Sequence, residues 1–448
     1  MSDIRFLKLV LSRSIAIMPS LLLVNGIAIA IDARSPVVAK EPTTRSEITE
    51  YRSQGSAGID RFLKINGGEM ARLRSQPGNP RWQQLNLMLD RICKQRDCYA
   101  SRLYWHTDFE AAKQAARASG KPILSLRLLG NLDEDLSCAN SRFFRITLYS
   151  HPEIAQLLRD KYILHWQSVR PVPKITIDFG DGRKVQQTLT GNSIHYILDK
   201  DGRPIDALPG LYAPQAFKHQ LIQGAAFVTK YHQLASSERE DAISQYHQTQ
   251  LTSLQANWKQ DLDKLGINIP LPKSIKSLTN PPTAEEAAPI AISKMVIEPG
   301  VSLTRAFSRR SDLLKKATDD PLWVKLGELH QKDATLADNS IELIRSKQPQ
   351  LISQNKDSDP IPELVTRFQK LIAIDSIRNE YLLHSQIHEW MMNPIFGRGD
   401  VESLNTRVYD QLFLTPKSDR WLGLMPTDGY TGIDRDGITD DPSVIPVN

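Results

Sequence analysis

Residues 108–129 read D-F-E-A-A-K-Q-A-A-R-A-S-G-K-P-I-L-S-L-R-L-L, and this stretch decides the fold class. Asp108 can cap a helix whose body, residues 109–119, is rich in alanine and other strong helix formers, and Gly120 ends it. The apolar run at 123–129 then predicts a buried strand. A helix followed at once by a buried strand is typical of an α/β domain.

The chain after this strand predicts a central mixed sheet flanked by helices. A helix is expected to begin near Cys138, and residues 162–167 form a second apolar strand. The turn sequences G-D-G-R at 180–183 and D-K-D-G-R at 199–203 each separate two short apolar runs, which predicts two hairpins. We therefore place an α/β domain over residues 100–224.

The rest of the chain differs from this domain in composition and in the period of its apolar residues. We predict a disordered lead-in at 31–58, a helical lead-in at 59–99, a helical extension at 225–266, a Pro-rich linker at 267–300, a mostly α-helical C-terminal region at 301–426 and a loose tail at 427–448.

The N-terminus has the pattern of an export signal. Arg5, Lys8 and Arg13 precede an apolar stretch at 15–31, and Ala28-Ile29-Ala30 offers small residues for cleavage. This pattern predicts a signal peptide at 1–30 and a periplasmic or extracellular protein. The alternative is an uncleaved membrane anchor through residues 15–31, the one case in which we expect a membrane partner.

Charge and motifs exclude several classes of function. The formal net charge is +5, and basic and acidic residues are interspersed without a basic patch or aromatic reading motif, so we expect no nucleic-acid partner. No G-x-x-x-x-G-K phosphate loop and no G-x-S-x-G nucleophile elbow occurs. We predict no cofactor.

Three cysteines remain as candidates for chemistry. Cys93 and Cys98 are close enough in sequence to be a candidate disulfide in an oxidising compartment. This pairing leaves Cys138 as an odd thiol. At a helix start, with Arg142 four residues later, a thiolate would be stabilised. The alternative is that Cys138 is a small buried residue of the core.

The segment from Trp105 to about Ile222 resembles the thioredoxin-like superfamily. The resemblance rests on the helix and strand entry at 108–124, the following Cys138 and the closing hairpin at 194–210, about a quarter to a third of the chain. It implies a thioredoxin-like domain followed by the helical C-terminal region. It also implies that a cis-proline of the family corresponds to a place near Ser193, where this sequence has no proline.

The resemblance also implies a chemistry. Cys138-Ala139-Asn140-Ser141 matches the family's C-x-x-C motif, with Cys138 as the attacking cysteine and Ser141 in place of the resolving one. Without a second thiol a mixed disulfide cannot be resolved internally. The implied activity is monothiol thiol–disulfide exchange or isomerisation, with protein thiols or disulfides as partners.

Two functions therefore stay open, and so does the question of whether the chain is an enzyme. One is an exported thiol–disulfide oxidoreductase or isomerase that uses Cys138. The other is a non-catalytic binding or scaffold protein, with a protein partner held through the fold and the C-terminal helices. Accessibility of the Cys138 thiol distinguishes them.

One histidine pair also needs attention. His384 and His388 lie four residues apart, so both rings would share one helix face. A metal ion in a protein requires a third and usually a fourth ligand, which the sequence does not indicate. We predict no metal site.

Overall fold

The computed structural model describes residues 45–188, 191–270, 321–355, 358–393, 399–413, 415 and 433. The predicted signal peptide, most of the linker at 267–300 and almost all of the tail at 427–448 lie outside these residues. Within the described ranges, no helix has both the length and the hydropathy of a membrane span.

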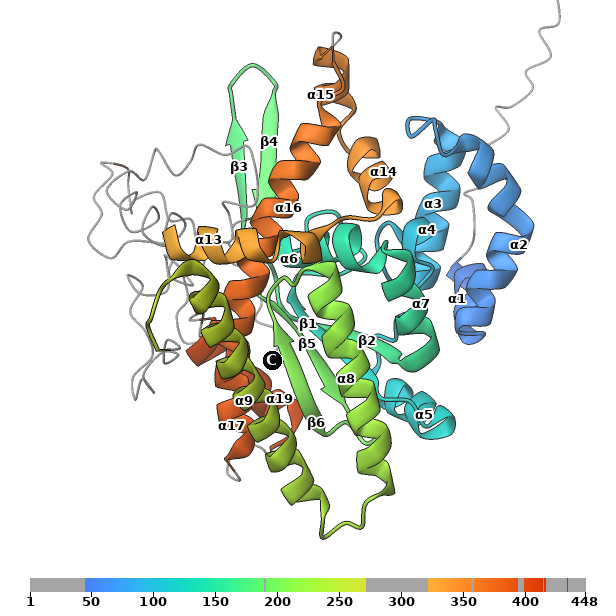
Figure 1. The fold of residues 1–448 in the computed structure, drawn as a ribbon. Helices are drawn as coiled ribbons and strands as arrows, with labels where there is room; N and C mark the ends of the chain where they lie inside the picture. Colours follow the sequence, from blue (N-terminus) through green and yellow to red (C-terminus); the bar gives the residue numbers. More distant parts are fainter. Residues whose placement is uncertain are drawn as a thin grey trace, which may run out of the picture. The chain divides into compact units, whose positions relative to one another are not determined.

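Four strands form one mixed sheet in the order β2-β1-β5-β6. Its strands are β1 (Ile123–Leu129), β2 (Ile163–Arg170), β5 (Ser193–Leu198) and β6 (Pro204–Pro209). Strand β1 runs parallel to β2 and antiparallel to β5, and β6 is antiparallel to β5. Strands β3 (Lys174–Asp178) and β4 (Lys184–Thr188) form a separate hairpin that projects away from the sheet (Figure 1). A mixed sheet with helices is thus present, as predicted.

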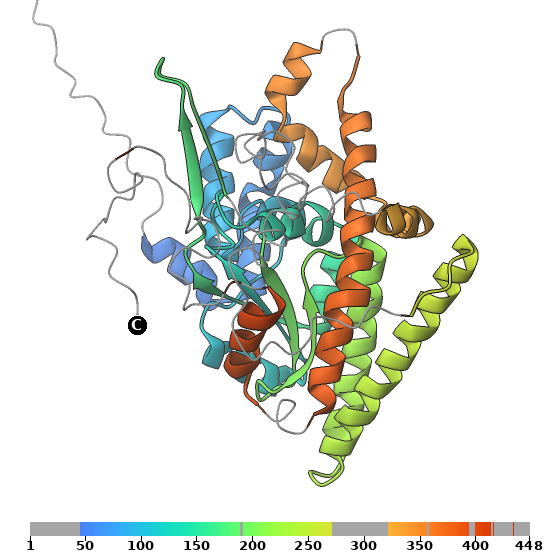
Figure 2. The ribbon, with the colours of Figure 1, turned by 90° about the vertical axis from the view of Figure 1, so that its left-hand side faces the viewer.

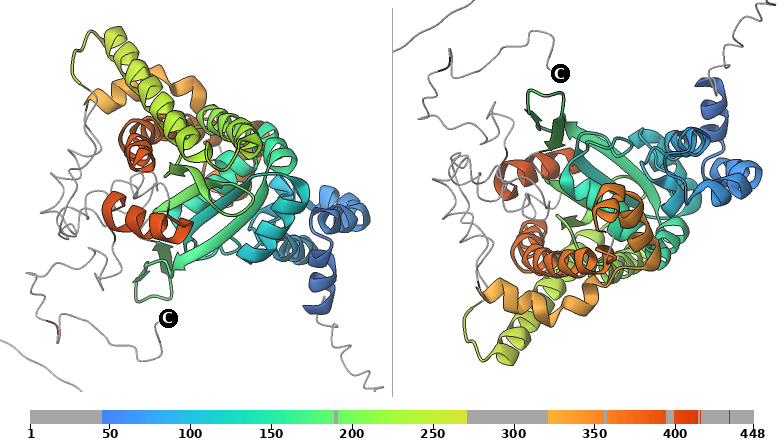
Figure 3. Two further views of the ribbon diagram at one scale, coloured as in Figure 1. Left: turned by 90° about the horizontal axis from the view of Figure 1, so that it is seen from below. Right: turned by 90° about the horizontal axis from the view of Figure 1, so that it is seen from above.

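Helices cover both faces of the sheet (Figure 3). The α/β domain contributes α5 (Phe109–Ser119), α6 (Ala139–Phe143), the π-helical turn η1 (Phe144–Tyr149), α7 (Pro152–Lys161) and α8 (Pro214–Gln233). On one face, His195 contacts Phe144 of η1 and Phe217 of α8. On the other face, the Arg127 guanidinium lies 5.6 Å from the Phe109 ring of α5. Helix α8 extends beyond the predicted domain end at residue 224.

The N-terminal part of the described chain is helical. It consists of α1 (Arg45–Ser53), α2 (Ser56–Leu73), α3 (Pro80–Cys93) and α4 (Cys98–Ser101). The prediction of disorder over 31–58 was wrong for residues 45–58. Ile48 and Tyr51 of α1, three residues apart, pack on a small apolar core with Phe62 of α2. Arg52 also donates hydrogen bonds to two backbone carbonyls, which fixes α1 in place.

The segment predicted as a helical extension at 225–266 contains α9 (Arg239–Leu265). The described part of the C-terminal region is helical, as predicted (Figure 2). Its elements are α13 (Pro321–Leu329), η3 (Gln331–Ala334), α14 (Asp338–Ser346), α15 (Pro349–Gln354), α16 (Ile361–Arg378), the π-helical turn η4 (Asn379–His384), α17 (Ser385–Met392), α19 (Val401–Arg407) and the π-helical turn η5 (Val408–Leu412). Buried residues such as Ile372 and Phe413 belong to the same apolar core as Leu126 of β1. These helices therefore complete the core of the sheet.

A close backbone contact fixes this docking. Gly210, directly after β6, has a φ of +80°, and a Cβ there would lie 2.5 Å from Asn379 of η4. The Asn379 side-chain amide donates to the Leu211 carbonyl at 2.7 Å. Glycine is favoured at position 210 because it adopts a positive φ without strain and because a side chain there would collide with Asn379.

Candidate functional site

Cys138 is the N-cap residue of α6, at the end of the loop that leaves β1. Its side chain is fully buried within the apolar core. The sulfur lies 2.8 Å from the Ser193 hydroxyl and donates to Ser141 Oγ at 3.5 Å. The fold thus brings together Cys138, Ser141 and Ser193, which the sequence analysis singled out, but it places them away from solvent.

The chain's own C-terminal segment covers the loop beside this cysteine. The Tyr409 hydroxyl of η5 donates to the Asn192 carbonyl at 3.1 Å, and the Asn192 amide donates to Thr415 Oγ1 at 3.2 Å. Burial, and then the Cys138 charge, raise the pKa of Tyr409 well above its ordinary value, so its hydroxyl stays a donor. A substrate disulfide cannot reach the sulfur while this cover is in place.

The two arginines that follow Cys138 in the sequence, Arg142 and Arg145, form hydrogen bonds to other residues. Arg142 donates to the Ser137 carbonyl at 3.1 Å and to Thr188 Oγ1 at 2.8 Å. Arg145 donates to the Glu134 carbonyl at 2.9 Å. Their guanidinium groups thus tie the loop after β1 to η1 and to the β3–β4 hairpin. We expected Arg142 to stabilise a Cys138 thiolate. Among the described residues its hydrogen bonds run to Ser137 and Thr188 instead.

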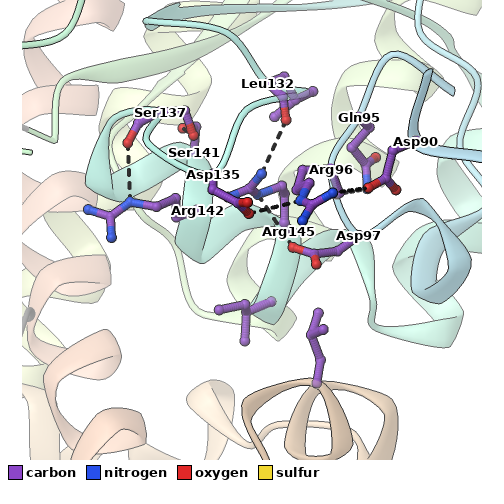
Figure 4. Close-up of polar contacts among 12 residues, drawn as sticks. Asp90, Gln95, Arg96, Asp97, Leu132, Asp135, Ser137, Ser141, Arg142 and Arg145 are labelled. Carbon is purple, nitrogen blue, oxygen red and sulfur yellow. Dashed lines mark hydrogen bonds and ion pairs between the residues drawn. The ribbon is translucent and has the colours of Figure 1, made fainter. Parts of the chain in front are cut away.

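Asp135, three residues before Cys138, belongs to a network of ion pairs (Figure 4). Asp135 accepts from Arg96 Nε at 2.8 Å, and Arg96 also pairs with the buried Asp90 at 3.0 Å. Asp97, which is also buried, pairs at 2.8 Å with Lys347, the residue directly after α14. The network joins the N-terminal helices, the loop before Cys138 and the C-terminal region.

Burial sets the electrostatics of this network. Burial, and then the neighbouring Asp97 charge, raise the pKa of Asp90 to about 7. Cys93 and Cys98 form a disulfide with their Cα atoms 6.3 Å apart, and the loop it closes contains Arg96 and Asp97. The bond therefore holds two of the network's charges in position, and both sulfurs lie in the small N-terminal core, away from Cys138.

A cavity of about 580 Å³ opens beside this network, between the α6–η1 segment and helices α14 and α16. Its charged lining is mainly basic, with Arg142, Arg145, Lys347 and Arg367 against Asp135. Its apolar lining residues are Phe143, Ile146, Ile344, Leu364, Phe368 and Leu371. Cavities of this size with apolar walls and a few charged groups are typical of ligand sites.

The sequence indicated only part of this site. Arg142 was singled out for proximity to Cys138, whereas the structure places it on the cavity wall. Phe368, Leu371 and Arg367 were not found, because they lie more than 220 residues beyond Arg142 and have the ordinary spacing of an amphipathic helix. Only the docking of α16 makes them part of one site.

We expect Cys138 to resist alkylation in the native protein. Because the sulfur is fully buried, reaction with iodoacetamide at pH 8 requires opening of the core and should be at least about 1000-fold slower than in 8 M urea. Mass spectrometry of timed samples measures this ratio, and the Cys138→Ser variant is the control without a free thiol. Rapid native labelling that slows as the pH falls would instead indicate a reactive thiolate.

Comparisons of the chain with protein-family models, with curated proteins and with solved structures find no match.

Proposed function

We propose that this chain is an exported, non-catalytic binding protein built on a thioredoxin-like domain, with the cavity between η1 and α16 as its ligand site. The observation that carries the proposal is that Cys138 is fully buried and outside the lining of a cavity of about 580 Å³. Thiol–disulfide exchange requires an accessible thiolate. We therefore favour the binding alternative over monothiol exchange or isomerisation.

Three observations support the thioredoxin-like assignment. The sheet order β2-β1-β5-β6, with β1 parallel to β2 and antiparallel to β5, agrees with the order of elements expected from the resemblance. Cys138 caps the helix that follows β1. Ser193, at the place expected for the family's cis-proline, lies 2.8 Å from the cysteine sulfur. The Cys93–Cys98 disulfide supports export, because such bonds persist in oxidising compartments.

The lining of the cavity indicates the chemical class of the ligand. Four basic side chains against one acidic side chain favour a carboxylate, sulfonate or phosphate group. The aromatic and aliphatic wall, largely from α16, favours an apolar body next to that group. The ligand is thus an amphipathic anion, either a small molecule or a side-chain cluster on a partner protein. This use of α14 and α16 gives the C-terminal helices a role in binding.

A fluorescence titration tests this proposal on the full chain. The probe is 1-anilinonaphthalene-8-sulfonate, an apolar ring system with one sulfonate, and we expect saturable binding with a dissociation constant on the order of 10 μM. Arg367→Glu reverses a charge on the cavity wall and should weaken binding at least about 10-fold. Lys370→Glu, one turn along α16 and outside the lining, is the matched control and should leave affinity unchanged.

Displacement of the probe by other amphiphiles then tests separately whether the site requires an anionic group or only an apolar body. Decanoate should displace the probe, whereas decyltrimethylammonium, with the same chain length and the opposite charge, should not. Equal affinity in the Arg367→Glu and Lys370→Glu proteins, or equal displacement by both amphiphiles, would refute the cavity as an anion site.

A further inference from the structure

Four titratable side chains converge in the interior, on elements other than those that line the cavity or hold Cys138. They are Asp206 of β6, His247 of α9, His384 of η4 and His388 of α17, and all four are buried. Their convergence results from tertiary structure, because α17 and η4 pack against both α9 and β6. The proposed ligand site uses none of these groups.

Three of the four groups have the spacing of metal ligands. The ligand atoms of Asp206, His247 and His388 all lie within 4.8 Å of one another. The Nδ1 atoms of the two histidines face each other at 2.9 Å, and Asp206 Oδ1 lies 4.0 Å from His388 Nδ1. Around a tetrahedral ion with bonds of about 2.0–2.2 Å, two ligand atoms lie roughly 3.3–3.6 Å apart. The observed separations of 2.9 and 4.0 Å lie on either side of this distance.

The groups around Asp206 resemble the outer shell of a metal site. The Tyr246 hydroxyl donates to Asp206 Oδ2 at 2.7 Å, and His384 Nε2 lies 3.0 Å from Asp206 Oδ1. Hydrogen bonds of this kind hold a ligating carboxylate in the orientation that a metal ion requires. His384 in turn contacts Glu380 Oε2 at 3.4 Å, which fixes its ring.

The chemistry of the three side chains suits ligation. Each offers an imidazole nitrogen or a carboxylate oxygen, and all three are at most 1% exposed. Neutral imidazoles and an ionised carboxylate are the forms that bind transition metals. Burial of the cluster also protects a bound ion from solvent.

We propose that Asp206, His247 and His388 bind one divalent transition-metal ion of the zinc type, which fastens helices α9 and α17 to the sheet edge at β6. Two imidazoles and one carboxylate form a ligand set common for zinc, with the fourth position left to water. Of the His384/His388 pair singled out in the sequence, the proposed set uses only His388, together with Asp206 and His247, and it departs from the prediction of no metal site. It is independent of the proposed ligand cavity.

Metal binding to the full chain tests the proposal directly. After treatment with a chelator and buffer exchange, Zn²⁺ is titrated by calorimetry, and Co²⁺ is titrated by its visible absorption. We expect one equivalent of each ion to bind and the thermal midpoint to rise with added Zn²⁺. Absence of a stoichiometric site in the folded wild-type protein would overturn the proposal.

The Zn²⁺ affinity of single variants tests which residues bind the ion. His247→Gln and His388→Gln each remove one ligand and should weaken Zn²⁺ binding by more than about 100-fold, while Tyr246→Phe, a change behind the carboxylate, should weaken it about 10- to 100-fold. His219→Gln, at an exposed histidine, is the matched control. Circular dichroism identifies any variant that does not fold, and Tyr246→Phe then carries the test. Unchanged affinity in folded ligand variants would place the ion elsewhere and refute the assignment.

Discussion

Lowering the pH from 6.5 to 4.5 is expected to lower the free energy of unfolding of this protein by roughly 8 kcal/mol. Burial lowers the pKa of His165 and His195 to about 3 and that of His247 to about 4, and it lowers the pKa of His388 as well. The unfolded chain takes up these protons near pH 6.5, whereas the folded chain does not. Stability conferred by neutral, buried histidines is therefore present above pH 6.5 and is lost as the pH falls below it.

One carboxyl opposes this trend. The pKa of Asp90 is raised to about 7, so the folded state binds one extra proton between about pH 4 and 7. Four histidines less this carboxyl give a net difference of about three protons. Burial also lowers the pKa of His106, His151 and His232, so the slope is at least about 4 kcal/mol per pH unit. Against a typical stability of about 5–15 kcal/mol, a slope of about 4 kcal/mol per pH unit below pH 6.5 places the acid transition between roughly pH 3 and 5.

Urea unfolding at a series of pH values, in the presence of a chelator, measures this slope. His195→Phe is the informative variant, because the ring lies among Phe144, Tyr149 and Phe217. Removing one titrating group should reduce the slope by about 1.4 kcal/mol per pH unit. The exposed His219→Gln variant should keep the wild-type slope. Constant stability from pH 6.5 to 4.5 would contradict the prediction.

Replacing Asp206 with asparagine should lower the free energy of unfolding by up to about 3–5 kcal/mol at pH 7, because the buried His384 cation loses its nearer carboxylate partner and keeps only Glu380 at 3.4 Å. The side chains of Asp206 and His384 are at most 1% exposed, and Nε2 and Oδ1 are 3.0 Å apart. Burial alone would lower the pKa of His384, but the Asp206 charge outweighs it and raises that pKa to about 10. The ion pair is therefore intact at neutral pH.

Two comparisons isolate this ion pair in chelator-treated protein. Asp263→Asn, which removes the exposed partner of Lys259 on α9, should cost less than about 0.5 kcal/mol. Adding His384→Gln to Asp206→Asn should cost less than the two single changes together, because the buried cation that Asp206→Asn destabilises is then absent.

The pH dependence gives a second readout of the same pair. A raised histidine pKa stabilises the fold fully below pH 6.5, and this stabilisation is lost as the pH rises through about 10. The difference between wild type and Asp206→Asn should therefore shrink over this range. A loss of under 1 kcal/mol at pH 7 would show that the pair contributes little.

The sequence determined the local structure of this protein well. The capped helix at 109–119, the strand at 123–129 and the two hairpins are found at or within a few residues of the predicted positions. Each depends on neighbouring residues: a cap, a glycine stop or a turn between short apolar runs. The 45–58 segment was missed because its short apolar stripe becomes stable only when it packs on α2 and α3.

The burial of Cys138, the cavity and the histidine cluster depend on tertiary structure and could not be predicted from local sequence. Whether Cys138 is a reactive thiol or a core residue depends on the contacts of Tyr409 and Thr415 with Asn192, more than 200 residues away in sequence. The cavity and the histidine cluster likewise combine residues from distant helices. Helical periodicity shows which face of such a helix is apolar but not which element it meets, because packing partners are chosen by the whole core and not by local sequence.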